Sequence, residues 1–177
     1  MLKMLNSFGI IPKKMTNNLK NIRDLTFEEI EEFFLTYNRP KFRASQVYKW
    51  LWSNFVYDFS QMTNLSLNDR NLLISNFAIK SISKYEYIDS KDGTIKFLFK
   101  IDNEKVVEGV LIPQKDRYTV CISSQAGCSL ACKFCATGKL KLLRNLAAWE
   151  IFDQVYLINK FSLEKYKSKI TNIVYMG

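Results

Sequence analysis

The spacing of apolar side chains changes along the chain and divides it into two regions. Between about residue 20 and residue 80 apolar positions recur every three or four residues, which is typical of amphipathic helices. After Ile82 they recur at every second position, which is typical of strands with one buried face. We therefore expect a helical region followed by a region built on a sheet.

Three helices are predicted in the first region. Thr26 and Glu29 form a capping-box pattern in front of the first helix, and Arg39-Pro40 ends it. A second helix is expected from about residue 44 to residue 55, and a third begins at Ser66. The apolar faces contain Phe27, Ile30, Phe33, Phe34, Tyr37, Val47, Tyr48, Leu51, Trp52, Phe55, Leu72, Leu73 and Phe77. We expect these aromatic stripes to form the core of a small domain.

The second region is predicted to contain strands, one further helix and a last strand. A turn at Asp92-Gly93 predicts a hairpin between residues 94–101 and a strand that ends near Ile88. Two more strands are expected at 105–112 and 117–123, separated by Pro113 and a charged turn. A helix at 147–160 and a strand at 169–176 would complete a βαβ unit. In barrels of such units functional groups lie at the carboxyl ends of the strands.

Composition and charge agree with a cytoplasmic protein that binds a polyanion. The 177 residues are 47 % hydrophobic, but no apolar run is long enough to span a membrane, and the N-terminus lacks the features of a signal peptide. We therefore expect reduced cysteines and no membrane partner. The net charge is +9, and the basic residues are concentrated before residue 21 and after residue 90. Such a charge suits nucleic-acid binding, although compositional drift toward lysine would produce the same excess.

One cysteine motif carries most of the chemical information. Cys128, Cys132 and Cys135 are spaced C-x3-C-x2-C, with Phe134 before the third cysteine. Three thiolates can hold three irons of a cubane cluster and leave the fourth iron open. Structural zinc would need a fourth ligand, for which Cys121 is the one candidate, because the chain has no histidine. Unligated or disulfide-bonded cysteines are the third alternative.

The cysteine loop (residues 128–135) resembles the cluster loop of radical S-adenosylmethionine (SAM) enzymes. The wider sequence at 120–128, 132–138 and 144–146 resembles the family of dual-specificity RNA methyltransferases, which methylate C2 of an adenosine in 23S ribosomal RNA and in certain transfer RNAs. The resemblance covers roughly residues 20 to 177. Further matching segments are Pro40 to Ala44, Gln46, Trp50, Met62 to Leu65, Asp92 to Thr94 and Glu108 to Pro113.

The resemblance implies site residues and cofactors. A [4Fe-4S] cluster would be held by Cys128, Cys132 and Cys135, and SAM would bind its open iron with Phe134 near the adenine of SAM. Glu108 matches a carboxylate that transfers a proton at the substrate adenine. Cys121 matches the cysteine that resolves a covalent RNA–enzyme intermediate. From the sequence pattern alone, Glu108 could be an outward-facing strand residue and Cys121 a small buried one.

The resemblance also implies partners. The substrates would be 23S rRNA and tRNA, an electron donor such as flavodoxin would be needed, and the protein would be a monomer. The helical domain would help to hold RNA, with Lys41, Arg43 and Lys49 as candidates for phosphate contacts. The alternative for these three residues is an ordinary solvated helix face.

The expected fold class is α+β followed by α/β. It comprises a basic N-terminal segment (1–19), a helical RNA-binding-like domain (20–80), and strands with the start of a radical SAM (β/α)6 barrel (81–177). Only the first βαβ unit of that barrel is present, so we expect a truncated chain that is inactive alone. Two alternatives stay open: a related methyltransferase that modifies C8 of the same adenosine, and a basic RNA-binding module with structural zinc.

Overall fold

The structure is a computed structural model of the chain, and it describes residues 19–82, 85–101, 105–130, 132–133 and 135–176. Most of the N-terminal segment predicted at 1–19 therefore lies outside the described residues. The described residues form two compact units that meet in sequence between Ser81 and Ile82. We refer to them as the helical unit and the sheet unit.

The helical unit contains the three predicted helices, α1 (Phe27–Thr36), α2 (Phe42–Trp52) and α3 (Leu67–Asn76). The other elements are two 3-10 turns, η1 (Ile22–Asp24) and η2 (Phe59–Gln61), and the parallel pair β1 (Lys20–Asn21) and β2 (Phe77–Ala78).

The predicted starts of the first and third helices are confirmed, whereas α2 begins at Phe42, two residues before its predicted start. The Thr26 hydroxyl accepts the Glu29 N–H, and the Glu29 carboxylate accepts the Thr26 N–H at 2.7 Å. The Ser66 side chain caps α3 by accepting the N–H of Asp69. The predicted end of the second helix is wrong, because α2 stops at Trp52 and Phe55 adopts a left-handed backbone conformation with φ 53°.

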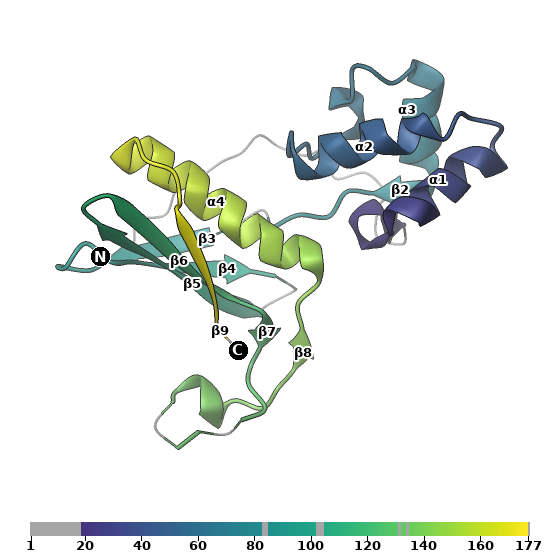
Figure 1. Cartoon of the computed structure of the whole chain (residues 1–177). Coiled ribbons are helices and arrows are strands. Elements are labelled where there is room, and N and C mark those ends of the chain that lie inside the picture. The colour runs from purple at the N-terminus through teal and green to yellow at the C-terminus, as the bar shows by residue number, and fades with distance from the viewer. Residues whose placement is uncertain (1–18, 83–84, 102–104, 131, 134, 177) are drawn as a thin grey trace. The chain divides into compact units, whose positions relative to one another are not determined.

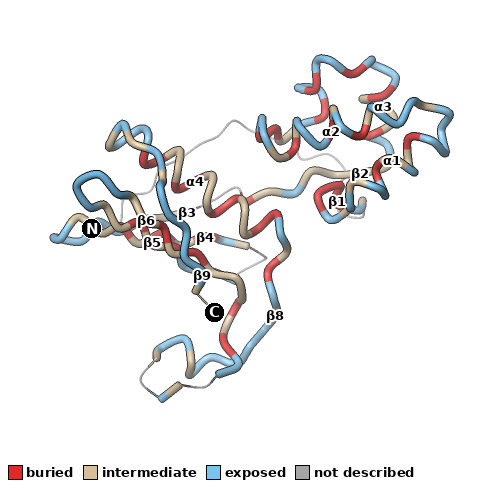
Figure 2. Tube along the Cα trace, in the orientation of Figure 1, coloured by how far each residue is buried: buried red, intermediate tan, exposed pale blue. Residues whose placement is uncertain are grey.

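The core of the helical unit comes from all three helices and the turns between them (Figure 2). Its buried residues are Ile22, Ile30, Phe34, Ala44, Val47, Leu51, Val56, Phe59, Met62, Leu65 and Leu73. The prediction that whole aromatic stripes are buried is wrong at Tyr37 and Tyr48, which are 44 % and 40 % exposed. Tyrosine can remain at the rim of a core because its hydroxyl group keeps its solvent contacts there.

The sheet unit is built on five strands in the order β3-β4-β5-β6-β9 (Figure 1). These are β3 (Tyr85–Asp89), β4 (Ile95–Lys100), β5 (Val106–Gln114), β6 (Arg117–Ser123) and β9 (Asn172–Met176). The first four are antiparallel neighbours, which confirms the predicted hairpin. After α4 (Ala148–Tyr166) the chain returns as β9, parallel to β6.

Pro113 lies within a strand and not in the predicted turn. β5 runs through it to Gln114, and Pro113 is paired with Tyr118 of β6. The register of β4 against β5 ends at Ile95 and Leu111, so β5 has one neighbouring strand at this point. Proline is accepted there because no second ladder needs its missing N–H.

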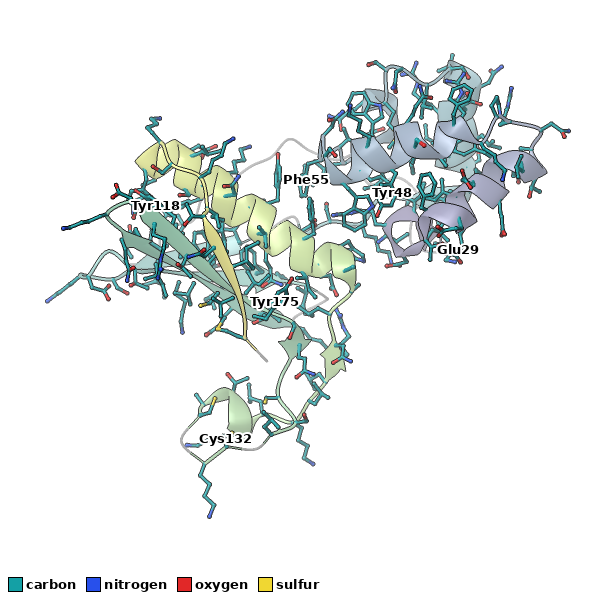
Figure 3. The ribbon with its side chains drawn as sticks, in the orientation of Figure 1. Glu29, Tyr48, Phe55, Tyr118, Cys132 and Tyr175 are labelled. Carbon is teal, nitrogen blue, oxygen red and sulfur yellow. The ribbon has the colours of Figure 1, made fainter. Side chains whose placement is uncertain are left out.

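Helix α4 covers one face of the sheet (Figure 1). The buried residues of this layer include Ile95, Phe97, Phe99, Val107, Leu111, Val120, Ile122, Leu157, Ile158 and Phe161. An ideal Cβ on Gly109 would lie 2.9 Å from Phe99 Cε2 and 3.0 Å from Ile158 Cδ1, so only a glycine lets the helix lie this close to β5. At the outer strand β9, Tyr175 is 65 % exposed (Figure 3). Within the described residues no helix combines the length and the apolarity needed to cross a bilayer.

Candidate active site at the cysteine loop

The cysteine loop extends from a short two-stranded stem (Figure 1). The stem consists of β7 (Gln125–Ala126) and β8 (Arg144–Asn145), which pair in antiparallel fashion directly after β6. The N–H of Leu143 donates to the carbonyl of Ala126 at 2.8 Å, and the N–H of Leu146 donates to the carbonyl of Ser124 at 2.9 Å. The stem therefore places the loop at the carboxyl end of β6.

The three loop cysteines differ in their surroundings. Cys128 is buried, whereas Cys132 and Cys135 are half-buried (Figure 3 labels Cys132). The N–H of Leu130 donates to Cys128 Sγ at 3.4 Å, and the N–H of Cys135 donates to the Cys132 carbonyl at 3.1 Å. All three cysteines are free thiols, as is Cys121.

The donor chemistry of this loop fits an iron–sulfur cluster, because three soft thiolate ligands come from one short segment and no histidine is present. Within the described ranges no three Cys, Asp or Glu side chains are gathered closely enough to hold a metal ion. Cys121 lies within the sheet, paired with Val110 and Val174, and not in the loop. Phe134, the residue expected beside SAM, lies outside the described residues.

Glu108 and Cys121 lie on the same face of the sheet. The register pairs Val110 with Cys121 and Gly109 with Ile122, which places Glu108 across from Ser123. Paired residues point to the same face, so Glu108 and Cys121 share the face opposite α4. The Ser123 hydroxyl donates to the Glu108 carbonyl at 2.8 Å. Both candidate residues therefore lie near the end of β6 that leads into the loop.

Lys96 contacts the candidate residue Glu108, and the sequence analysis did not identify this contact. Its Nζ lies 2.9 Å from Glu108 Oε1, and the two side chains are 45 % and 49 % exposed. Lys96 is paired with Val110 and so points to the same face as the carboxylate. The alternation of β4 predicts that Lys96 and Phe97 point to opposite faces of the sheet. The contact between Lys96 and Glu108 also depends on the register of β4 against β5, which cannot be read from the sequence.

In the helical unit, the three candidates for phosphate contacts differ from one another. Lys41 and Lys49 are exposed. Arg43 is half-buried: its Nε lies 3.4 Å from Asp69 Oδ2, and its side chain is 23 % exposed. The carboxylate of Asp69 is buried and also lies 3.2 Å from Arg39 Nε. The sequence analysis missed Asp69, which looks like an ordinary first-turn residue of a helix.

Two of the segments that carry the family resemblance are joined by Asn64. The Trp50 Nε1–H donates to Asn64 Oδ1 at 2.6 Å, and Arg43 Nη1 donates to the Asn64 carbonyl at 3.4 Å. Arg43 Nη1 also donates to Gln46 Oε1 at 2.9 Å. These four residues of the helical unit thus form one hydrogen-bonded network.

Comparison with known proteins identifies relatives of both units. Residues 20–79 match the family described as "Ribosomal RNA large subunit methyltransferase N-terminal domain". A "Probable dual-specificity RNA methyltransferase RlmN" from Cytophaga hutchinsonii is 52 % identical over 158 residues, which cover 89 % of this chain and 43 % of that protein. A "Dual-specificity RNA methyltransferase RlmN" from Campylobacter hominis is 40 % identical over 172 residues, which cover 90 % of this chain and 47 % of that protein.

A solved structure agrees with these relatives. The crystal structure of a radical SAM methyltransferase from Sphaerobacter thermophilus superposes with a TM-score of 0.70 at 34 % sequence identity, covering 88 % of this chain and 47 % of that one. The chain thus spans less than half the length of the relatives that it matches. The resemblance predicted from the cysteine loop and its flanking segments is confirmed.

Proposed function

We propose that the chain supplies the cluster loop and an RNA-contacting domain of a radical SAM methyltransferase, because it is similar to the dual-specificity RNA methyltransferases, of which it spans less than half the length. The substrate would be C2 of an adenosine in 23S rRNA and in tRNA. The observation that carries the proposal is the position of the C-x3-C-x2-C loop. It follows the carboxyl end of β6, and β6 is connected through α4 to its parallel neighbour β9.

Cys128, Cys132 and Cys135 would hold a [4Fe-4S] cluster, and SAM would bind at the open iron, with Phe134 beside its adenine. When bound, such a cluster supplies the electron that cleaves SAM and so begins radical chemistry at a carbon that is a poor nucleophile. The parallel unit β6-α4-β9 would be the first of the six repeats of a (β/α)6 barrel.

Glu108 would hold or deliver a proton at the substrate adenine. Lys96, 2.9 Å from the carboxylate, would keep it oriented on the face opposite α4. Cys121, on the neighbouring strand and the same face, would resolve the covalent RNA–enzyme intermediate. The shared face supports these roles, since both groups can then reach one adenine presented near the end of β6.

The helical unit would contact RNA phosphates. The exposed Lys41 and Lys49 support this assignment. In this proposal residues 20–80 form the RNA-contacting domain, and 1–19 add a basic segment. The protein would be a cytoplasmic monomer that receives electrons from a donor such as flavodoxin.

Spectroscopy on the reconstituted chain tests the cofactor assignment. We expect about four irons per chain after anaerobic incubation with iron and sulfide. The electron paramagnetic resonance signal of the reduced protein should change shape when SAM is added. Cys132→Ser should lose the signal, while Cys121→Ser should keep it. Bound zinc without a cluster, or equal iron loss in both variants, would contradict the proposal.

A further inference from the structure

An ion pair with a buried carboxylate holds β8, the strand by which the chain returns from the cysteine loop. Arg144 of β8 donates from Nη1 to Glu150 Oε2 at 2.6 Å and from Nη2 to Glu150 Oε1 at 2.7 Å. The Glu150 side chain is 1 % exposed, and its Oε2 also accepts the N–H of Ala147 at 2.8 Å. A bidentate pair of this kind fixes both distance and orientation. It ties β8 to the first turn of α4.

Gln154, which is fully buried, connects the same helix to the end of β6, from which the chain enters the cysteine loop. Its Oε1 accepts the N–H of Ser123 at 3.0 Å, and its Nε2 donates to the Ser123 carbonyl at 3.0 Å. Nε2 also donates to the Glu150 carbonyl at 3.2 Å. The side chain of Gln154 in α4 therefore makes hydrogen bonds with both the N–H and the carbonyl of Ser123, the last residue of β6.

The two sides of the stem, β7 and β8 with the residues next to them, also contact each other directly. Gln125 Nε2 donates to Asn145 Oδ1 at 2.9 Å across the β7–β8 pair. Gly127 has φ +78°, and an ideal Cβ on it would lie 2.1 Å from the Lys141 carbonyl oxygen. A side chain has no room at this point, so the close approach of the two backbones requires glycine.

From this geometry we infer that Arg144, Glu150 and Gln154 are positioning residues that close the stem of the cysteine loop before any metal binds. The inference deepens the proposed function and rests on it for the identity of the cofactor. None of the contacts involves a cysteine, so the stem does not need a cluster to form. Fixing both ends of a loop reduces the entropy that its thiols lose when they converge on a metal.

Near-isosteric variants separate this role from a general effect on α4. Glu150→Gln keeps the size of the side chain but removes its charge, and Gln154→Met removes both hydrogen bonds to Ser123. Arg144→Lys keeps the charge but cannot make the bidentate contact. The matched control is Lys165→Met, which breaks the ion pair of the same helix with Asp89, 2.6 Å away in the sheet unit and remote from the stem.

The first readout needs no cofactor. In the metal-free chain, hydrogen exchange at the amides of Leu143 and Leu146, which donate across the stem, should be at least tenfold faster in the three stem variants than in the unchanged chain. Lys165→Met should leave both rates unchanged. Unaltered exchange in folded stem variants, or equal acceleration in the control, would overturn the inference. If Glu150→Gln does not fold, Arg144→Lys and Gln154→Met still decide the question.

The second readout uses the reconstituted chain. Iron should leave the stem variants several-fold faster than the unchanged chain when an iron chelator is added, because their thiols are less well placed. Equal release rates would overturn the positioning role. If the unchanged chain binds no iron, the proposed function fails, while the exchange rates in the metal-free chain still test whether the three residues close the stem.

Discussion

Arg43 illustrates how a basic side chain within a family motif can serve the interior of a domain. Its guanidinium contacts the buried carboxylate of Asp69, the side chain of Gln46 and the backbone of Asn64. It also lies over the ring of Phe42 at 4.9 Å. Because these groups already hold its guanidinium, Arg43 is less available to a phosphate than Lys41 or Lys49.

Arg43→Ala should therefore lower the free energy of unfolding of the helical unit by about 2 kcal/mol, since a buried carboxylate loses one of its partners. Lys49→Ala, on the exposed side of the same helix, should change it by less than about 0.5 kcal/mol. Urea denaturation followed by circular dichroism measures both changes. Equal effects of the two variants would show that Arg43 is a surface residue in solution.

The exposed lysines should affect RNA binding instead. Each of Lys41→Ala and Lys49→Ala is expected to reduce the slope of log K against log salt by about 1, because one phosphate contact and its released counterion are lost. Fluorescence anisotropy with a short RNA over a salt series gives the slope. Lys165→Ala serves as the control, since Lys165 is held by Asp89. An unchanged slope in both helix variants would exclude a phosphate contact at these lysines.

At the scale of single elements, the close contact between α4 and the sheet depends on Gly109. Gly109→Ala places a methyl group about 3 Å from Phe99 and Ile158, and we expect a loss of about 1–3 kcal/mol in the stability of the sheet unit. Val110→Ala is the control on the opposite face of the same strand. Thermal unfolding separates the two variants, and a neutral Gly109→Ala would mean that α4 can shift without cost.

At the end of α4 a substitution is expected to increase the stability of the chain. Lys167 follows the helix with φ 56°, a conformation that glycine adopts without strain. Lys167→Gly should therefore stabilise the chain by about 0.5–1 kcal/mol. Lys167→Ala removes the same Nζ contact with the Glu164 carbonyl but keeps a Cβ, so it should not stabilise. Equal unfolding midpoints for the two variants would contradict this explanation.

Local signals explain which elements could be predicted from the sequence. Thr26, Ser66 and the Asp92-Gly93 turn act on neighbouring residues, so these two helix starts and the hairpin were predicted correctly. The predicted end of the last helix at residue 160 is wrong, because α4 continues to Tyr166. Phe161 lies in this extension and packs on the Tyr87 and Phe97 rings at 4.9 and 5.0 Å, a contact with the sheet that helical periodicity does not report.

The same reasoning applies to the candidate site. The cysteine spacing is local and was recognisable at once, whereas the partners of its flanking residues come from other elements. The Lys96–Glu108 pair requires the strand register, and the Ser123–Gln154 contacts require the packing of α4 on β6. Sequence reasoning could therefore name the candidate ligands, but not the contacts that Glu108 and Ser123 make with other elements.

At the scale of the whole molecule, the division into two units predicts two separate responses to core substitutions. The core of the helical unit consists of residues between Ile22 and Leu73, and Phe34 is fully buried within it. Phe34→Ala should destabilise this unit by about 3–5 kcal/mol. In this variant the rate of amide hydrogen exchange should increase more in α1–α3 than in β4–β6, because the sheet has its own buried residues.

Leu35→Ala is a matched control for this experiment, since Leu35 follows Phe34 in α1 but is 46 % exposed. The converse variant, Phe97→Ala, removes a fully buried ring between the sheet and α4 and should raise exchange in the sheet unit first. Equal loss of protection in both units from either variant would show that they unfold as one cooperative body. Separate responses would mean that the helical unit and the sheet unit can be altered independently of each other.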